Sequence, residues 1–260
     1  MSSRLWRRCC ARHVIASALL VAGEASPAGA QRTTYHNFNS WYNLAADVGL
    51  DQRWTGSVDM QDKRSGPIRQ PEGFLFRLSL TDAVAPAVKL GFGVVRSESY
   101  PFGEIPSAYQ TPERSVFEQV QLTQNIDRLT ITHRYRLEER WLGKRGADTS
   151  DHRIANWLQS GRARYQLKGV LPMHGQRVEV GSAYLAATDE VFVNFGKNVA
   201  NNVFDQNRAG VALGWRYAHD WRGEVGFLQQ TSLKPNGRDL EQNATLTFGM
   251  YYTRQARKKD

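Results

Sequence analysis

The chain has 260 residues, a formal net charge of +9 and 41% hydrophobic residues. Lysine and arginine are spread along the sequence without the concentrated patch of a nucleic-acid-binding protein, so the composition argues against that class. No apolar run approaches the roughly 20 residues that a helical membrane span needs. The sequence therefore predicts no transmembrane helix.

The N-terminal 30 residues have the three parts of a secretory signal peptide. The apolar stretch 14–23 is followed by small residues at Ala28 and Ala30, and it is preceded by a basic cluster of Arg4, Arg7, Arg8 and Arg12. This order predicts cleavage after Ala30, leaving residues 31–260 as a single domain. Both cysteines, Cys9 and Cys10, precede the apolar stretch. The predicted mature chain therefore has no disulfide, no thiol nucleophile and no lipid anchor.

From residue 38 onward, segment after segment alternates apolar and polar residues with a period of two, which predicts β-strands. The clearest is 131–141, where Ile131, Tyr135 and Leu137 share one face with His133 and Trp141. Similar alternation is found at 74–80, 88–94, 162–167, 177–184, 208–217, 221–227 and 240–250. The predicted fold class is therefore all-β.

Three features favour an antiparallel transmembrane β-barrel over a soluble sandwich. The segments reach the roughly 9 to 11 residues that a tilted strand needs to cross a bilayer. The polar faces are rich in arginine and glycine, as suits a wet or ion-paired lumen. Aromatic residues at segment ends predict interfacial girdles, namely Trp54, Trp141, Trp157, Tyr217, Trp221 and Tyr252.

The predicted connections alternate in length, as in outer-membrane barrels with long external loops. The long ones are 63–71, 97–113, 143–151 and 189–205, and the shorter ones 82–86, 125–127, 169–175 and 219–220. Residues 52–252 supply ten strands, and segment 38–47 would make an eleventh. We reason that a barrel with both ends in the periplasm does not permit an odd number. Either 38–47 is no full strand or a twelfth strand is unrecognised, so we expect about 10 to 12 strands.

Four segments resemble the bacterial domain-of-unknown-function family 2490. They are 133–140 (HRYRLEER), 162–165 (RARY), 189–194 (DEVFVN) and 204–208 (FDQNR). The resemblance extends from Trp41 to the last strand. It implies an exported, barrel-forming protein without an assigned activity, and it transfers no catalytic residue.

The strongest polar feature is a cluster of charged residues on the predicted lumenal faces. It comprises Arg134, Arg136, Glu138, Arg140, Arg162, Arg164, Arg208, Arg216, Arg222 and Glu224. It is either a constriction that selects anions or a paired network that fills a narrow barrel, and we favour the network. Adding Arg77, Lys89, Arg177, Glu179 and Glu241 gives eleven cations against four anions. This excess predicts that water or an anionic ligand reaches part of the lumen.

Enzymatic and metal sites find little support. No histidine after residue 30 is followed two positions later by serine, and G-x-S-x-G, S-x-x-K and H-E-x-x-H are absent. His133 is the first candidate for a triad assembled from distant strands, although its apolar face favours a packing role. Five residues around one predicted loop have side-chain oxygens that could bind Ca²⁺, namely Asp189, Glu190, Asn194, Asp205 and Asn207. Their spacing does not match that of an EF-hand. We predict no cofactor, no metal and no catalytic residue.

Three hypotheses remain open from the sequence. The first is an outer-membrane barrel that is a narrow or plugged pore or an envelope scaffold, in contact with outer-membrane lipid and lipopolysaccharide and open at most to small anionic solutes. The second is an outer-membrane lipid-modifying enzyme, and the third is a soluble periplasmic β protein. Partition into the outer-membrane fraction separates the third from the others, and lipid turnover separates the second from the first.

Overall fold

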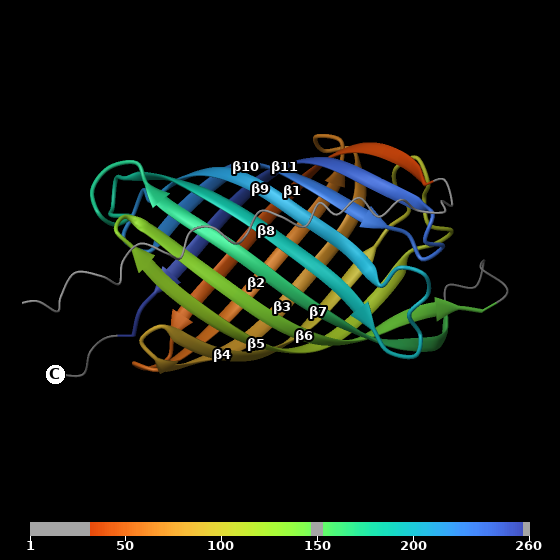
Figure 1. The fold of residues 1–260 in the computed structure, drawn as a ribbon, viewed down its shortest axis with the longest axis horizontal. Coiled ribbons are helices and arrows are strands. Elements are labelled where there is room, and N and C mark those ends of the chain that lie inside the picture. The colour runs from red at the N-terminus through yellow and green to blue at the C-terminus, as the bar shows by residue number, and fades with distance from the viewer. Residues whose placement is uncertain (1–31, 147–152, 257–260) are drawn as a thin grey trace, which may run out of the picture. The chain divides into compact units, whose positions relative to one another are not determined.

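The computed structural model describes residues 32–146 and 153–256, which form a closed barrel of eleven β-strands (Figure 1). The predicted signal peptide lies outside the described residues. The strands are β1 (Thr33–Gly49), β2 (Trp54–Ser65), β3 (Gln70–Ala85), β4 (Val88–Ser99), β5 (Thr111–Ile126), β6 (Leu129–Arg145), β7 (Ile154–Pro172), β8 (Ala183–Phe195), β9 (Phe204–Trp215), β10 (Trp221–Leu233) and β11 (Asp239–Arg254). Within the described ranges, no helix is long and apolar enough to cross a membrane.

Strands adjacent in sequence pair antiparallel, and the ring closes where β1 pairs with β11 in parallel. In Figure 1 the red-orange β1 lies beside the blue β11. Thr33 is opposite Asp239, and the pairing continues to Val48 opposite Arg254. The parity argument from the sequence is therefore wrong. Segment 38–47 belongs to a full strand, and no twelfth strand is needed, because one parallel pair lets an odd number of strands close.

The two ends of the barrel differ. At what we call the loop end, β2, β4, β6, β8 and β10 finish and β1 begins; at the turn end, β1, β3, β5, β7, β9 and β11 finish. Two tight connections at the turn end are 86–87 and 127–128, where Asp127 adopts a positive φ of 53°, a conformation that Asp tolerates better than most residues. In the turn 50–53, Asp51 accepts hydrogen bonds from the backbone N–H groups of Arg53 and Trp54, which lower the pKa of its carboxyl.

One predicted connection at the turn end is misplaced. The sequence predicts a strand near 177–184, whereas 173–182 is a connection and β8 begins at Ala183. Arg177 and Glu179 therefore do not face the lumen from a strand. Instead, the Ser182 hydroxyl bonds to both backbone groups of Glu179 and stabilises a local turn.

Side chains on the two faces of the wall follow the predicted alternation. Large apolar residues point outward and are exposed, among them Leu137 (50%), Phe92 (57%) and Val211 (62%). Polar and charged residues point inward and are buried, including Arg136 (4%) and Glu138 (3%). The barrel is thus apolar outside and polar inside.

Candidate functional site

A network of arginine and carboxylate side chains fills the middle of the lumen. We call it the central network, and it consists of Arg134, Arg136, Glu138, Arg162, Arg164 and Glu190. Strand register brings these residues together, since Arg136 is opposite Arg164 and Glu138 is opposite Arg162 between β6 and β7. Residues two apart on a strand point to the same face. The row of charges on β6 therefore meets a second row on β7.

Glu138 is the acceptor at the centre of this network. Its Oε1 lies 2.6 Å from Arg164 Nη1, and its Oε2 lies 2.6 Å from Arg162 Nη2 and 2.7 Å from Arg162 Nε. Its side chain is 2% exposed. A carboxylate buried this deeply needs paired cations to remain charged. Arg162 and Arg164 supply them, with Arg136 Nη1 3.7 Å from Oε1 as a third.

Glu190 on β8 is the second acceptor. Arg164 donates to it from Nη2 (2.8 Å) and Nε (3.0 Å), Arg134 donates from Nη2 (2.8 Å), and Gln166 donates from Nε2 (3.3 Å). Arg164 thus bridges Glu138 and Glu190. Charge-assisted, multiply bonded contacts of this kind fix side chains in one geometry.

Further contacts extend the network toward the loop end. Arg140 pairs with Glu113 through two bonds of 2.7 Å, and Arg162 Nη1 lies 3.2 Å from Asp205. On the neighbouring strand β5, Gln119 Oε1 accepts hydrogen bonds from Arg136 at 2.7 and 3.1 Å. The Phe117 ring centroid, also on β5, lies 4.0 Å from the guanidinium carbon of Arg136.

Phe192, which is 1% exposed, is the aromatic centre of the lumen. The guanidinium carbons of Arg164, Arg208 and Arg162 lie 4.4, 4.8 and 5.4 Å from its ring centroid. Attraction between a cation and an aromatic face strengthens when both are removed from water. The ring therefore offsets part of the repulsion among the three arginines.

The predicted charge cluster divides into two groups. Seven of its ten residues lie in or beside the central network. Glu224, Arg222 and Arg216 lie toward the turn end, where Tyr184 donates to Glu224 at 2.7 Å and Arg222 donates to Thr253 at 3.1 Å. Arg216 donates to the backbone carbonyls of His219 and Val178, so it stabilises connections.

The predicted excess of lumenal cations is wrong as counted, because several acids outside that count also face the lumen. They are Asp59, Glu72, Glu113, Glu190 and Asp205. Asp59 pairs with Arg77 at 3.4 Å, and Glu72 accepts the indole N–H of Trp41 at 3.0 Å. Lys89, counted as lumenal, is exposed near the turn end. Asp59 lies between Val58 and Met60, and this alternation with apolar neighbours is the signal that could have identified it as lumenal.

The residues weighed for other chemistry do not converge. His133 lies on the outer wall, where its Nδ1 is 2.8 Å from the Tyr165 hydroxyl. Asn207 donates to Asp189 at 2.7 Å on the outer wall, whereas Glu190 is inside the barrel, so the candidate Ca²⁺ ligands lie on opposite faces. In the described part of the chain, no group of three His, Cys, Asp or Glu residues is arranged to hold a metal ion.

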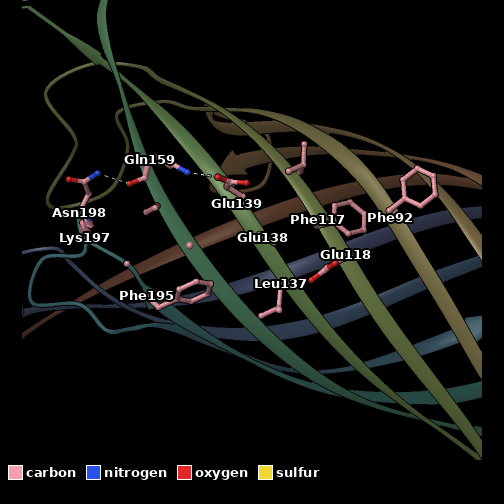
Figure 2. A pocket seen from close by; sticks show the side chains of 14 residues that line it. Phe92, Phe117, Glu118, Leu137, Glu138, Glu139, Gln159, Phe195, Lys197 and Asn198 are labelled. Atoms are coloured by element: carbon pink, nitrogen blue, oxygen red, sulfur yellow. Dashed lines mark hydrogen bonds between the residues drawn. The ribbon is translucent and has the colours of Figure 1, made fainter.

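The outer wall carries a groove over β4 to β8, shown in Figure 2. Phe92, Leu137 and Phe195 line it, with Glu118 among them. At its loop-end rim Gln159 donates to Glu139, and Asn198 donates to the Gln159 carbonyl at 2.8 Å. The groove is therefore apolar along most of its length, with a polar rim and one carboxylate within it.

Comparison with known proteins identifies a family for this chain. The model of a family described as "Protein of unknown function (DUF2490)" matches residues 38–241, from within β1 to the first residues of β11. No curated protein matches the chain, and no solved structure matches it. Because the match covers most of the chain and nearly the whole barrel, this protein belongs to the DUF2490 family.

Proposed function

We propose that this protein is an outer-membrane β-barrel of a Gram-negative bacterium whose lumen is closed by its own side chains, so that it serves as an envelope scaffold rather than as an open channel or an enzyme. The exposed side chains of the outer wall support the location in a membrane. Large apolar residues are exposed on it, such as Phe92, Leu137, Val211, Leu213 and Val225. Soluble monomers rarely expose contiguous apolar patches beyond a few hundred Å², and lipid removes the cost of such a surface.

Strand lengths and aromatic residues support the same location. The strands run from 12 residues in β2 to 19 in β7, which exceeds the roughly 9 to 11 that cross a bilayer. Trp221 and Tyr252 pack together at the turn end, with ring centroids 5.0 Å apart. Trp54 begins β2 at that end, while Trp141 and Trp157 lie near the loop end. Aromatic belts at both interfaces are typical of outer-membrane barrels.

The closed lumen rests on burial and pairing. Side chains from strands that are not neighbours meet in the interior, as Arg208 of β9 does with Trp41 of β1, and Glu138, Asn39 and Thr245 are each 3% exposed or less. At the loop end, the connection 100–110 reaches over the mouth, where the Glu104 N–H donates to Asn37 of β1 at 3.2 Å. Small barrels are commonly filled by their own side chains.

The two other hypotheses are less well supported. A lipid-modifying enzyme requires an activated nucleophile, and His133 on the outer wall bonds to Tyr165 rather than to a serine. A soluble periplasmic barrel would leave the apolar wall in water. The partners implied by the proposal are outer-membrane lipid and lipopolysaccharide, with small anionic solutes wherever the lumen admits them.

Fractionation of cells expressing the full chain tests the proposal. We expect the protein in the outer membrane, with Gln31 at its N-terminus and no turnover of lipid by the purified protein. Recovery in the soluble periplasm would overturn the location, and retention of residues 1–30 would overturn the signal peptide. Release of fatty acid or headgroup from added outer-membrane lipid would establish the enzymatic alternative.

A further inference from the structure

Two lumenal cations stand apart from the ion pairs of the barrel. Lys63 of β2 lies with its Nζ 4.2 Å from the ring centroid of Trp41, and the guanidinium carbon of Arg208 on β9 lies 4.8 Å from the same centroid. Arg208 Nε also donates to Gln206 at 3.2 Å. Within residues 32–146 and 153–256, no carboxylate lies within ion-pair distance of either cation. Neither side chain therefore has an ion-pair partner in the described part of the barrel, although both lie among aromatic rings inside it.

The acids nearest to this pair are already engaged. Glu190 is bonded to Arg164 and Arg134. Glu72 accepts the indole N–H of Trp41 at 3.0 Å and remains beyond ion-pair distance of Lys63. A single partly engaged carboxylate does not neutralise two cations inside a barrel, where unpaired charge is unfavourable.

Asn39 supplies an independent observation at the same place. Its side chain is fully buried (0% exposed), and neither its amide nitrogen nor its amide oxygen has a hydrogen-bond partner. It lies two residues before Trp41 on the lumenal face of β1, opposite Ser65 of β2, while Trp41 is opposite Lys63. Buried amides without a partner are rare and call for an explanation. A ligand that accepts a hydrogen bond from Nδ2 provides one.

We propose that Lys63 and Arg208, placed over Trp41 and beside the amide of Asn39, form a lumenal binding site for a small oxyanion, a phosphate or carboxylate group. Such a group accepts charge-assisted hydrogen bonds from both cations and a further bond from the amide. Although they face the lumen, Lys63 and Arg208 both keep some accessible surface, so space for solvent-sized groups adjoins them. The site does not depend on where in the cell the barrel resides.

The site lies in the half of the barrel nearer the loop end. Asn39 is close to the start of β1 and Lys63 is close to the end of β2. The mouth above it is covered by connection 100–110, held by the bond from the Glu104 N–H to Asn37. An anion therefore enters from the loop end, past this connection, without passing the central network.

Binding of inorganic phosphate to the purified full chain in detergent tests the proposal. Binding is measured by calorimetry, and the unfolding midpoint by thermal unfolding, while phosphate replaces chloride at constant ionic strength. A parallel titration uses acetate in place of phosphate. We expect saturable binding and a rise in the unfolding midpoint. Lys63→Met and Arg208→Met should each weaken the binding by about tenfold or more, as expected for loss of a hydrogen bond to a charged group.

Arg222→Met is the matched control, because Arg222 is also a half-buried lumenal cation but lies toward the turn end against Thr253. It should bind phosphate like the unchanged chain. If Lys63→Met or Arg208→Met does not fold, Asn39→Ala provides the test. It should weaken phosphate binding without lowering stability in chloride, because the Asn39 amide has no hydrogen-bond partner in the protein. Binding of acetate but not phosphate would identify a carboxylate site. Binding of both acetate and phosphate would identify a general oxyanion site. No saturable binding of either anion, or binding that survives all three substitutions, would overturn the proposal.

Discussion

Arg164 joins Glu138 of β6 to Glu190 of β8, with its Nη1 2.6 Å from one carboxylate and its Nη2 2.8 Å from the other. The three residues lie on three consecutive strands, so the guanidinium fastens neighbouring parts of the wall together from inside. Arg162 and Arg134 use the same two carboxylates. Removal of Glu138 therefore takes one of two carboxylate partners from both Arg162 and Arg164, which keep only Asp205 and Glu190.

Glu138→Gln should therefore destabilise the barrel strongly. Loss of one partner from a buried ion pair typically costs about 3 to 5 kcal/mol. Equilibrium unfolding in detergent or liposomes measures the effect. The control is Glu98→Gln, which removes the 3.0 Å pair with Arg96, whose side chain is 63% exposed; that change should cost less than about 1 kcal/mol. Equal losses in the two variants would show that the central network does not hold the wall together.

The same network should control conductance. With the lumen filled by paired side chains, recordings in planar bilayers should show either no conductance or a small anion-preferring conductance. Glu138→Gln removes a negative charge from beside Arg162 and Arg164, so it should raise the anion preference wherever conductance exists. Large cation-selective steps would contradict this account of the lumen.

The alternation along single strands was enough to predict which face is inside. In β6, the sequence correctly placed Leu137 outward and Glu138 inward because a period of two leaves no other choice once the barrel is assumed. The closure of the ring was not predictable in this way. The parallel pairing of β1 with β11 depends on contacts between the two ends of the chain, which leave no local pattern.

The local sequence also failed to predict the full extent of β8. Adjacent Asp189 and Glu190 resemble a turn, because acidic residues are uncommon in strands, and the local sequence therefore predicts a loop there. In the structure Asp189 bonds to Asn207 outside, and Glu190 bonds to Arg164 and Arg134 inside. Tertiary partners from other strands override the local preference. The aromatic setting of Lys63 and Arg208 was missed for the same reason, since three separate strands form it.

Substitutions on the two faces of β6 should rank in a definite order. Leu137 points outward near the middle of the strand and is 50% exposed, so Leu137→Arg should destabilise the barrel in liposomes by roughly 2 to 4 kcal/mol. Thr132 faces the lumen, and Thr132→Gln should be tolerated. Folding assays in liposomes measure both. The reverse order would mean that the apolar face does not contact lipid.

Glu118 provides a test on the outer wall itself. It faces outward opposite Phe92 and Leu137, in the groove of Figure 2. If lipid covers this face, Glu118→Leu should stabilise the barrel in liposomes, because a polar group leaves an apolar surrounding. The control is Glu104→Leu in connection 100–110, which should change stability by less than about 0.5 kcal/mol. A loss of stability in Glu118→Leu would point to a protein partner in the groove.

The parallel closure makes a prediction about topology. β1 enters the barrel at the loop end and β11 leaves it at the turn end, because Thr33 is opposite Asp239 at the starts of both strands. If the barrel spans the outer membrane, epitopes placed just before Thr33 and just after Ala256 must lie on opposite sides. Since long connections usually face outward, the first should be accessible to antibody on intact cells and the second only after permeabilisation. An epitope in connection 100–110 should behave like the first. Exposure of both terminal epitopes on the same side would contradict the parallel pairing of β1 with β11.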